Sequence, residues 1–327
     1  MNWTKRSTAA LVLIATAGLI TACGAGTTGG DTSAAGAPVA GDQPIVNKAN
    51  WPEATPTSGL AKGLSLPLED YMQTYEETVT LDQASRTLQE ECMAGYGFSI
   101  QLPLAGATPP PNDNDANIER RYGITDRAAA AQYGYGLPDE LNNQTRQKMP
   151  DLTDDQIEVL TGHTKPTTTG PDTVPTSEPA PDTYQGKKIH PGGCVGWSDS
   201  QIGQSQIDLS LVSELDGQSL TASQRTPAVQ GAVSAWSQCM KTKGYDAATP
   251  YEAAEIVGHI DGAPSDEETA VAVADVDCKE STDLVAIWFK EDTAIQKKQI
   301  AEHLTGLTGA RNQNTKALAA ADKAVTG

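Results

Sequence analysis

The chain has 327 residues and a formal net charge of −19, from 42 acidic and 23 basic side chains. Because such a charge repels nucleic acid and anionic lipid headgroups, the composition argues against a nucleic-acid partner. It suits cationic partners or metal ions, although acidity that keeps a secreted protein soluble is the simpler interpretation.

The N-terminus has the organisation of a bacterial export signal. Lys5 and Arg6 precede an apolar run that ends at Ile20, and this run is shorter than the roughly 20 apolar residues that a spanning helix needs. The residues I-T-A-C that end at Cys23 resemble the lipobox of bacterial lipoproteins. The resemblance implies that residues 1–22 are a signal peptide and that a lipid, such as a palmitate-bearing diacylglycerol, is attached to the sulfur of Cys23.

The alternative is an ordinary secretory signal that is cut after Ala17, with Cys23 as a chance residue. The chain has five cysteines, and an odd thiol in an exported protein needs an explanation. If Cys23 carries lipid, four remain for two disulfides: Cys92, Cys194, Cys239 and Cys278. The expected location is therefore the extracytoplasmic face of the cell membrane, where the lipid on Cys23 anchors the chain.

Two segments contain too few large apolar residues to form a core. Residues 23–62 are rich in Gly, Ala, Thr, Ser and Pro and are expected to be a flexible tether. Residues 164–185 have a similar composition and are expected to be either a surface loop or a linker. They separate residues 63–163 from residues 186–327, which are the two expected halves of a mainly α-helical, disulfide-linked domain.

Helix signals dominate both halves, and strand patterns are scarce. The first half is expected to form helices from Tyr71 to Glu91, after Thr125, and after the capping box of Thr153 and Gln156. In the second half, helix starts are predicted at Thr226-Pro227, at Thr249-Pro250, and at Ser265 with Glu268. The last of these helices is expected to be long and to run beyond Leu307.

A short internal repeat supports two related halves. Leu88–Phe98 reads L-Q-E-E-C-M-A-G-Y-G-F and Ala235–Tyr245 reads A-W-S-Q-C-M-K-T-K-G-Y, so both contain Cys-Met-x-x-x-Gly-aromatic. Gly97 and Gly244 are placed where a helix C-terminus needs a residue that tolerates positive φ. The shared spacing favours duplication over chance.

Equivalent halves would link each Cys-Met helix to the next cysteine along the chain. This predicts the disulfides Cys92–Cys194 and Cys239–Cys278, although four thiols allow three pairings. Catalytic or metal-bound thiols are the competing interpretation. The sequence has no Cys-x-x-Cys motif and no clustered histidines, which argues against it.

The sequence lacks the common catalytic and phosphate-binding motifs, so no catalytic residue and no cofactor is predicted. One weak calcium candidate consists of alternating oxygen-bearing residues: Asp113, Asp115, Asn117 and Glu119. A calcium loop would need a glycine at Ile118 and an acid at Ile124, so a polar loop is the simpler interpretation. The nearby Tyr122, Tyr133 and Tyr135 could line a sugar or peptide groove, but ordinary loop packing is preferred.

The lipobox and the two Cys-Met segments together resemble surface lipoproteins of actinobacteria, and this resemblance implies an envelope location without a specific activity. The preferred function is a non-enzymatic, surface-tethered interaction or accessory module that binds an envelope protein partner. The alternative is an extracytoplasmic ligand-binding or hydrolytic protein that acts on cell-wall-derived substrates. The two α/β lobes of a transport solute-binding protein are not predicted, because alternating strands and helices are missing.

Overall fold

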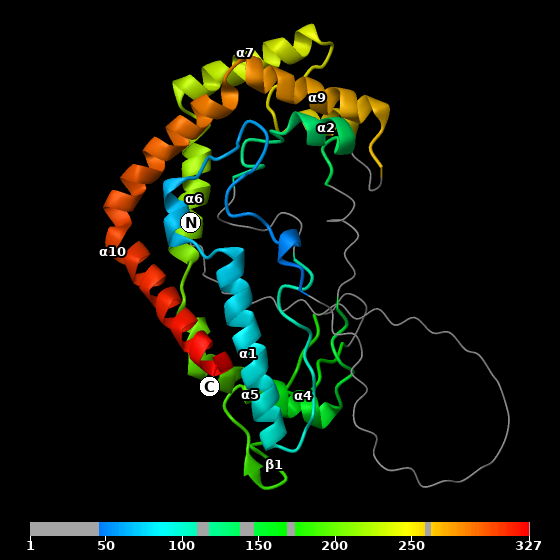
Figure 1. Ribbon diagram of the computed structural model, residues 1–327, viewed down its shortest axis with the longest axis vertical. Coiled ribbons are helices and arrows are strands. Elements are labelled where there is room, and N and C mark those ends of the chain that lie inside the picture. The colour runs from blue at the N-terminus through cyan, green and yellow to red at the C-terminus, as the bar shows by residue number, and fades with distance from the viewer. Residues whose placement is uncertain (1–45, 110–117, 138–146, 169–173, 259–262, 327) are drawn as a thin grey trace, which may run out of the picture. The chain divides into compact units, whose positions relative to one another are not determined.

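The computed structural model describes residues 46–109, 118–137, 147–168, 174–258 and 263–326. Within them the fold is mainly α-helical, as the sequence predicts (Figure 1). The α-helices are α1 (Tyr75–Gly95), α2 (Arg127–Tyr133), α4 (Asp154–Thr161), α5 (Gly193–Ile202), α6 (Ser210–Ser223), α7 (Pro227–Thr242), α8 (Ala253–Val257), α9 (Asp266–Ser281) and α10 (Leu284–Thr326). Shorter elements are the 3-10 helices η1 (Lys48–Asn50), η2 (Pro67–Tyr71) and η3 (Gln204–Gln206), and an antiparallel pair of strands, β1 (Thr183–Tyr184) and β2 (Lys187–Lys188).

Local capping residues begin several helices where the sequence predicts, but α8 begins at Ala253, without a side-chain cap and three residues after the predicted Thr249-Pro250. The side chain of Thr153 accepts from the backbone of Gln156, whose own side chain accepts from the backbone of Thr153, so α4 starts with a complete capping box. The hydroxyls of Thr226 and Ser265 accept from the backbone N–H groups of Val229 and Glu268 and so cap α7 and α9. A further capping box at Thr74 starts α1, which begins four residues after the predicted Tyr71.

The long helix expected after Ser265 is two helices, which corrects the prediction. Helix α9 ends at Ser281, and α10 begins at Leu284 and runs to Thr326. The backbone of Asp283 is left-handed, with φ of 52°, and this conformation redirects the chain. Aspartate tolerates that conformation better than most residues do, and the break therefore needs neither glycine nor proline.

Helices of the two expected halves pack on each other. Helix α5, which lies in residues 186–327, packs on α1, which lies in residues 63–163. Helix α2 of the first half likewise packs on α9 of the second half. Helix α10 contacts η2, α1, α5, α6, α7 and α9. Figure 1 shows α10 passing from the group of α7 and α9 to the group of α1 and α5. Helices that are distant along the chain therefore share each core.

The two segments that are poor in large apolar residues make ordered contacts in their described parts. Trp51, inside the expected tether of residues 23–62, donates its indole N–H to the carbonyl of Gly106 at 2.8 Å, and Ala61 is fully buried. In residues 164–185, the backbone N–H of Thr167 donates to Thr176 and that of Ala180 donates to Gly162. The described part of this segment is therefore a surface loop that returns to its starting point.

The repeated Cys-Met segments end their helices with the same backbone hydrogen bonds. Phe98 N–H donates to the carbonyl of Met93, and Tyr245 N–H donates to that of Met240, both at 3.0 Å. Each bond closes a Schellman motif around a glycine of positive φ, 88° at Gly97 and 93° at Gly244. Both methionines are fully buried. The sequence repeat is thus also a repeat of helix-end geometry.

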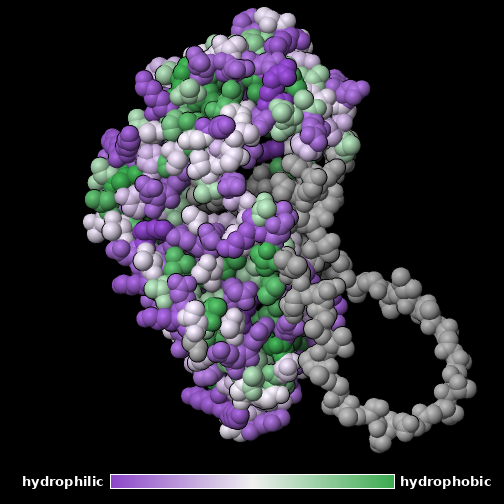
Figure 2. Space-filling model, viewed as in Figure 1, coloured by the Kyte–Doolittle hydropathy of each residue, from purple (hydrophilic) through white to green (hydrophobic). Residues whose placement is uncertain are grey.

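Hydrophilic residues cover most of the face seen in Figure 2, and the hydrophobic residues lie in small separate groups. Among the described residues, no helix combines the length and the apolar composition that crossing a bilayer requires.

Candidate functional site

The structure contains two disulfides, Cys92–Cys194 and Cys239–Cys278, which are the pairs expected from the repeat. The first joins the end of α1 to the start of α5, and the second joins α7 to α9. Trp236 and Trp288 pack in the same core cluster as Cys278. Cys23 lies outside the described residues.

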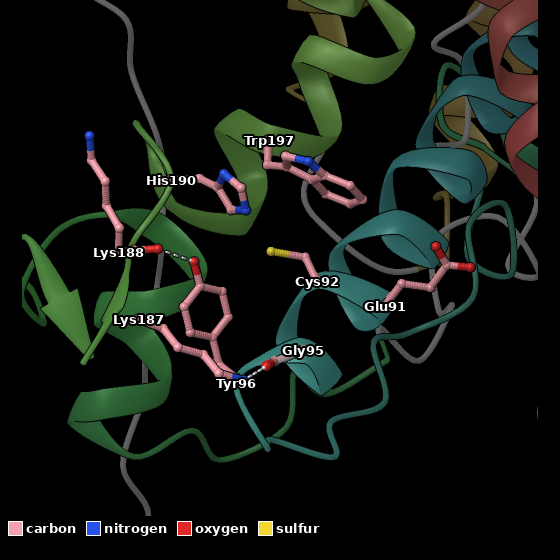
Figure 3. Close-up of a pocket in the computed structure, with 8 residues that line it drawn as sticks. All are labelled: Glu91, Cys92, Gly95, Tyr96, Lys187, Lys188, His190 and Trp197. Carbon is pink, nitrogen blue, oxygen red and sulfur yellow. Dashed lines mark hydrogen bonds between the residues drawn. The ribbon is translucent and has the colours of Figure 1, made fainter. Parts of the chain in front are cut away.

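An open pocket of about 490 Å³ lies beside the Cys92–Cys194 disulfide. The end of α1 contributes Glu91, Cys92 and Tyr96, the strand β2 contributes its two lysines, and His190 and Trp197 complete the wall. In Figure 3 the three rings surround the sulfur of Cys92, with the lysines on one side and Glu91 on the other. The volume falls in the range typical of small-molecule sites.

Three connections hold the pocket walls together. The Cys92–Cys194 disulfide fixes α5 on α1. The ammonium of Lys187 donates to the carbonyl of Gly95, which is one of the carbonyls that a helix end leaves without an internal partner. The hydroxyl of Tyr96 donates to the carbonyl of Lys188 at 2.7 Å. The strand pair and both helices are therefore tied to one another around the pocket.

The rings and charges of the pocket come from separate segments. The ring of His190 contacts that of Tyr96 edge-on, with centroids 6.3 Å apart, and that of Trp197 at 5.9 Å. His190 is exposed, whereas Tyr96 and Trp197 are half-buried. Lys187, Lys188 and Glu91 are all exposed, and Figure 3 shows the ammonium of Lys188 and the carboxylate of Glu91 pointing away from the rings. The sequence did not predict this site, because its residues come from distant segments and lie close together only when β2 and α5 pack on the end of α1.

The calcium candidate cannot be assembled from the described residues. Asp113, Asp115 and Asn117 lie outside them, and of this set only Glu119 is described. The carbonyl of Glu119 accepts a hydrogen bond from the hydroxyl of Thr125 at 3.3 Å. The described ranges contain no group of His, Cys, Asp or Glu side chains that is suited to a metal ion.

The tyrosines near residue 122 pack in the interior, as preferred from the sequence. The ring of Tyr122 is fully buried and lies 5.1 Å from the ring of Trp288. Its hydroxyl donates to Asp292 at 3.0 Å. The hydroxyl of Tyr135 lies 3.4 Å from a carboxylate oxygen of Asp275, which also pairs with Lys279. The rings of Tyr122 and Tyr135 therefore pack in and against the core.

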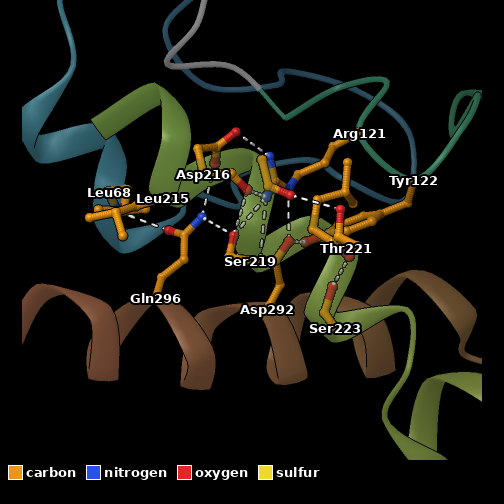
Figure 4. Close-up of polar contacts among 12 residues, drawn as sticks. Leu68, Arg121, Tyr122, Leu215, Asp216, Ser219, Thr221, Ser223, Asp292 and Gln296 are labelled. Carbon is orange, nitrogen blue, oxygen red and sulfur yellow. Dashed lines mark hydrogen bonds and ion pairs between the residues drawn. The ribbon is translucent and has the colours of Figure 1, made fainter. Parts of the chain in front are cut away.

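A buried polar network joins the segment of residues 118–125 to α6 and α10 (Figure 4). The guanidinium of Arg121 donates to Asp292 and to Asp216, each at 2.7 Å. Burial of Arg121 opposes its charge, but the hydrogen bond and the charge of Asp292, with those of Asp216, raise its pKa overall. The amide of Gln296 extends the network, since it donates to Asp216 and accepts from the backbone N–H of Leu68.

Comparisons with family models, curated proteins and solved structures give no significant match. Function is therefore inferred from the residues and their geometry.

Glu69, in η2, is a carboxyl whose ionisation opposes folding. One oxygen accepts from the hydroxyl of Ser65 at 2.7 Å, and the other is buried without a hydrogen-bond partner among the described residues. Burial raises the pKa of Glu69 from 4.5 to about 7, and the charge of Asp216 acts in the same direction. Hydrogen bonds with Leu66 and Ser65 and the charge of Arg121 oppose this rise in the pKa.

We therefore expect stability to fall as pH rises from about 4.5 to 7, because the unfolded chain ionises Glu69 before the folded chain does. The loss is about 1–2 kcal/mol, which is roughly half of what the full shift would give, because the carboxyl is partly solvated. Glu69→Gln removes this ionisation, so its stability relative to the original chain should increase with pH. Urea unfolding from pH 4 to pH 8 measures the difference.

The control is Glu302→Gln, which changes a solvated carboxyl on α10. It should give the same difference in stability at every pH, within error. A constant difference for Glu69→Gln as well would contradict the expected ionisation of Glu69.

Proposed function

We propose that the chain is a lipid-anchored protein of the extracytoplasmic face of the cell membrane, with an interaction or accessory role and no catalytic one. The observation that carries this proposal is the pair of disulfides, because such bonds persist in oxidising compartments. They use all four cysteines other than Cys23. The remaining thiol is thus the one that ends the lipobox-like run.

The pocket supports binding in preference to covalent catalysis. Its cysteine, Cys92, is oxidised in the disulfide and is not available as a thiolate nucleophile. The hydroxyl of Tyr96 and the ammonium of Lys187 donate to backbone carbonyls. The ring of His190 contacts other rings. Side chains that bond backbone carbonyls and contact other rings can form a binding surface. Nucleophilic catalysis needs a nucleophile beside a base.

Lipid attachment is tested by Cys23→Ala in a bacterial host fed an alkyne-labelled fatty acid. We expect the original chain to carry the label and to sediment with membranes, and the variant to carry none and to lose that association. Two acyl chains contribute about 0.8 kcal/mol for each buried methylene, so the change in partitioning should be nearly complete. Thr28→Ala, in the same segment, is the matched control and should behave like the original chain.

Mass spectrometry of the mature N-terminus separates the two possible signals. Cleavage before a lipid-modified Cys23 agrees with the proposal, whereas an unmodified chain that starts at Gly18 would overturn it. The interaction role is tested by crosslinking on intact cells, followed by purification of the original chain and of Cys23→Ala. A specific partner should be enriched with the anchored chain, and the absence of any partner from both samples would contradict an accessory role.

A further inference from the structure

We propose that the Cys92–Cys194 disulfide is a site of thiol–disulfide exchange, at which a small thiol from the surroundings attacks Cys92 through the pocket and releases Cys194. In this exchange the chain is the substrate and not the catalyst. The proposal concerns a covalent site and does not depend on lipid attachment or on a protein partner.

The pocket gives access to one end of the disulfide. Cys92 lines the cavity of about 490 Å³, whereas Cys194 is not part of its wall and is fully buried. Figure 3 shows the sulfur of Cys92 between the rings of Tyr96, His190 and Trp197. A cavity of this size accepts a small molecule. Because exchange depends on which sulfur the attacking thiolate can reach, attack is directed to Cys92.

The position of Cys194 favours its release as a thiolate. It is the second residue of α5, a helix that begins after Gly192 without a side-chain cap. The backbone N–H of Gly193 donates to the carbonyl of His190, whereas those of Cys194 and Val195 have no acceptor among the described residues. Side chains in a helix tilt toward its N-terminus, so that of Cys194 is directed toward the start of α5. Free N–H groups and the helix dipole stabilise a negative charge there.

The Cys239–Cys278 disulfide lacks this arrangement. Cys239 is half-buried, with its sulfur 3.7 Å from the hydroxyl oxygen of Ser281, so access alone does not protect it. Attack at Cys239 would release Cys278, which is fully buried in the core cluster of Trp236 and Trp288. Cys278 also lies in the last turn of α9, where the helix dipole opposes a negative charge. This disulfide should therefore open more slowly, and it is an internal reference in the same molecule.

The exchange consists of two displacements. In the first, the thiolate sulfur bonds the Sγ of Cys92, the Sγ–Sγ bond breaks, and its electron pair leaves with Cys194. In the second, another thiolate attacks the sulfur of the bound small thiol and releases Cys92 as a thiolate. The protein disulfide is thus reduced, and the two small thiols are oxidised to their own disulfide. Their protons pass through solvent to Cys92 and Cys194.

The exchange controls the link between two helices. Opening removes the covalent bond between the end of α1 and the start of α5, while the packing of α5 on α1 and α4 remains. Met93, Val159 and Leu160 share a core cluster with both cysteines. The redox state of the surrounding thiols therefore determines how firmly α5 and this cluster are held.

The experiment is partial reduction of the full mature, folded chain with 2-mercaptoethanol. Samples are quenched with excess N-ethylmaleimide at successive times, and their peptides are mapped by mass spectrometry. We expect Cys92–Cys194 to open about tenfold faster than Cys239–Cys278, because its leaving group is better stabilised. The first product should carry 2-mercaptoethanol on Cys92 and N-ethylmaleimide on Cys194, and the rate should increase in proportion to the thiol concentration.

Variants test the leaving group. Val195 is exposed beside Cys194, so Val195→Glu adds a negative charge to the first turn of α5 and should slow the opening about two- to fourfold relative to Val195→Gln. Val195→Lys should accelerate it by a similar factor. The matched control is Gln201→Glu, which adds the same charge at the other end of α5 and should leave the rate unchanged. Opening of Cys239–Cys278 should have the same rate in all four variants.

Four results would overturn the proposal. The first is opening of Cys239–Cys278 at least as fast as that of Cys92–Cys194. The second is a rate that does not depend on the thiol concentration, because exchange would then follow unfolding. The third is a first adduct on Cys194, and the fourth is equal rates for Val195→Glu and Val195→Gln. Circular dichroism and thermal unfolding of each variant verify that the rates refer to folded chains.

Discussion

Replacement of Asp292 by alanine is expected to destabilise the folded chain by about 3–5 kcal/mol, because removal of one partner leaves a buried charge without compensation. The side chain of Asp292 is fully buried, and that of Arg121 is only 10% exposed. The variant also removes the acceptor of the Tyr122 hydroxyl. Urea or guanidinium unfolding at neutral pH, followed by circular dichroism, measures the loss.

The matched control is Asp151→Ala, which removes an aspartate from an ion pair with Lys148 whose side chains are 89% and 80% exposed. That pair should contribute less than about 1 kcal/mol. A further variant, Asp292→Leu with Arg121→Met, should recover only part of the lost stability, because Asp216 then loses the guanidinium with which it pairs. Equal losses for Asp292→Ala and Asp151→Ala would contradict a structural role for the buried network.

Removal of the Cys92–Cys194 disulfide by double replacement with alanine is the second large change. The cysteines are 102 residues apart, and the chain-entropy model gives a loss of about 4.7 kcal/mol for a loop of this length. The same replacement at Cys239 and Cys278, 39 residues apart, should cost about 4 kcal/mol. Guanidinium unfolding of both double variants measures the two losses.

A loss of stability below about 1 kcal/mol in either variant would show that the linked helices hold their geometry without the bond.

Features that depend on adjacent residues could be predicted from the sequence. The starts of α4, α7 and α9 depend on a side chain that bonds a backbone N–H within three residues, so Thr153, Thr226 and Ser265 identify them. The glycine-containing helix ends at Gly97 and Gly244 are local for the same reason. Comparison of these two ends also indicated which cysteines pair.

Features that depend on distant residues could not be predicted in this way. The contact of Tyr96 with Lys188 spans 92 residues, and that of Arg121 with Asp292 spans 171. No periodicity in either segment indicates such a partner. The break at Asp283 has no glycine or proline to mark it. The pocket and the polar network therefore became visible only in the folded chain.

The repeated helix ends differ at several positions, and one of these places different side chains against their surroundings. Four residues after the cysteine, α1 is followed by Tyr96, whereas α7 is followed by Lys243. Tyr96 bonds β2 and lines the pocket, and the ammonium of Lys243 lies 3.9 Å from Asp277. One backbone motif thus supports a pocket at one place and a surface ion pair at the other.

Helix α10 consists of two helical segments that meet at the non-helical backbone of His303, and it connects the regions around the two disulfides. Trp288 packs with α7 and α9 near its start, and Ala317 packs with α1 near its end. Local unfolding of either region removes a surface on which α10 packs, so we expect amide protection against hydrogen exchange to decrease in both regions. The non-helical backbone at His303, between these contacts, is the point at which this cooperativity is weakest.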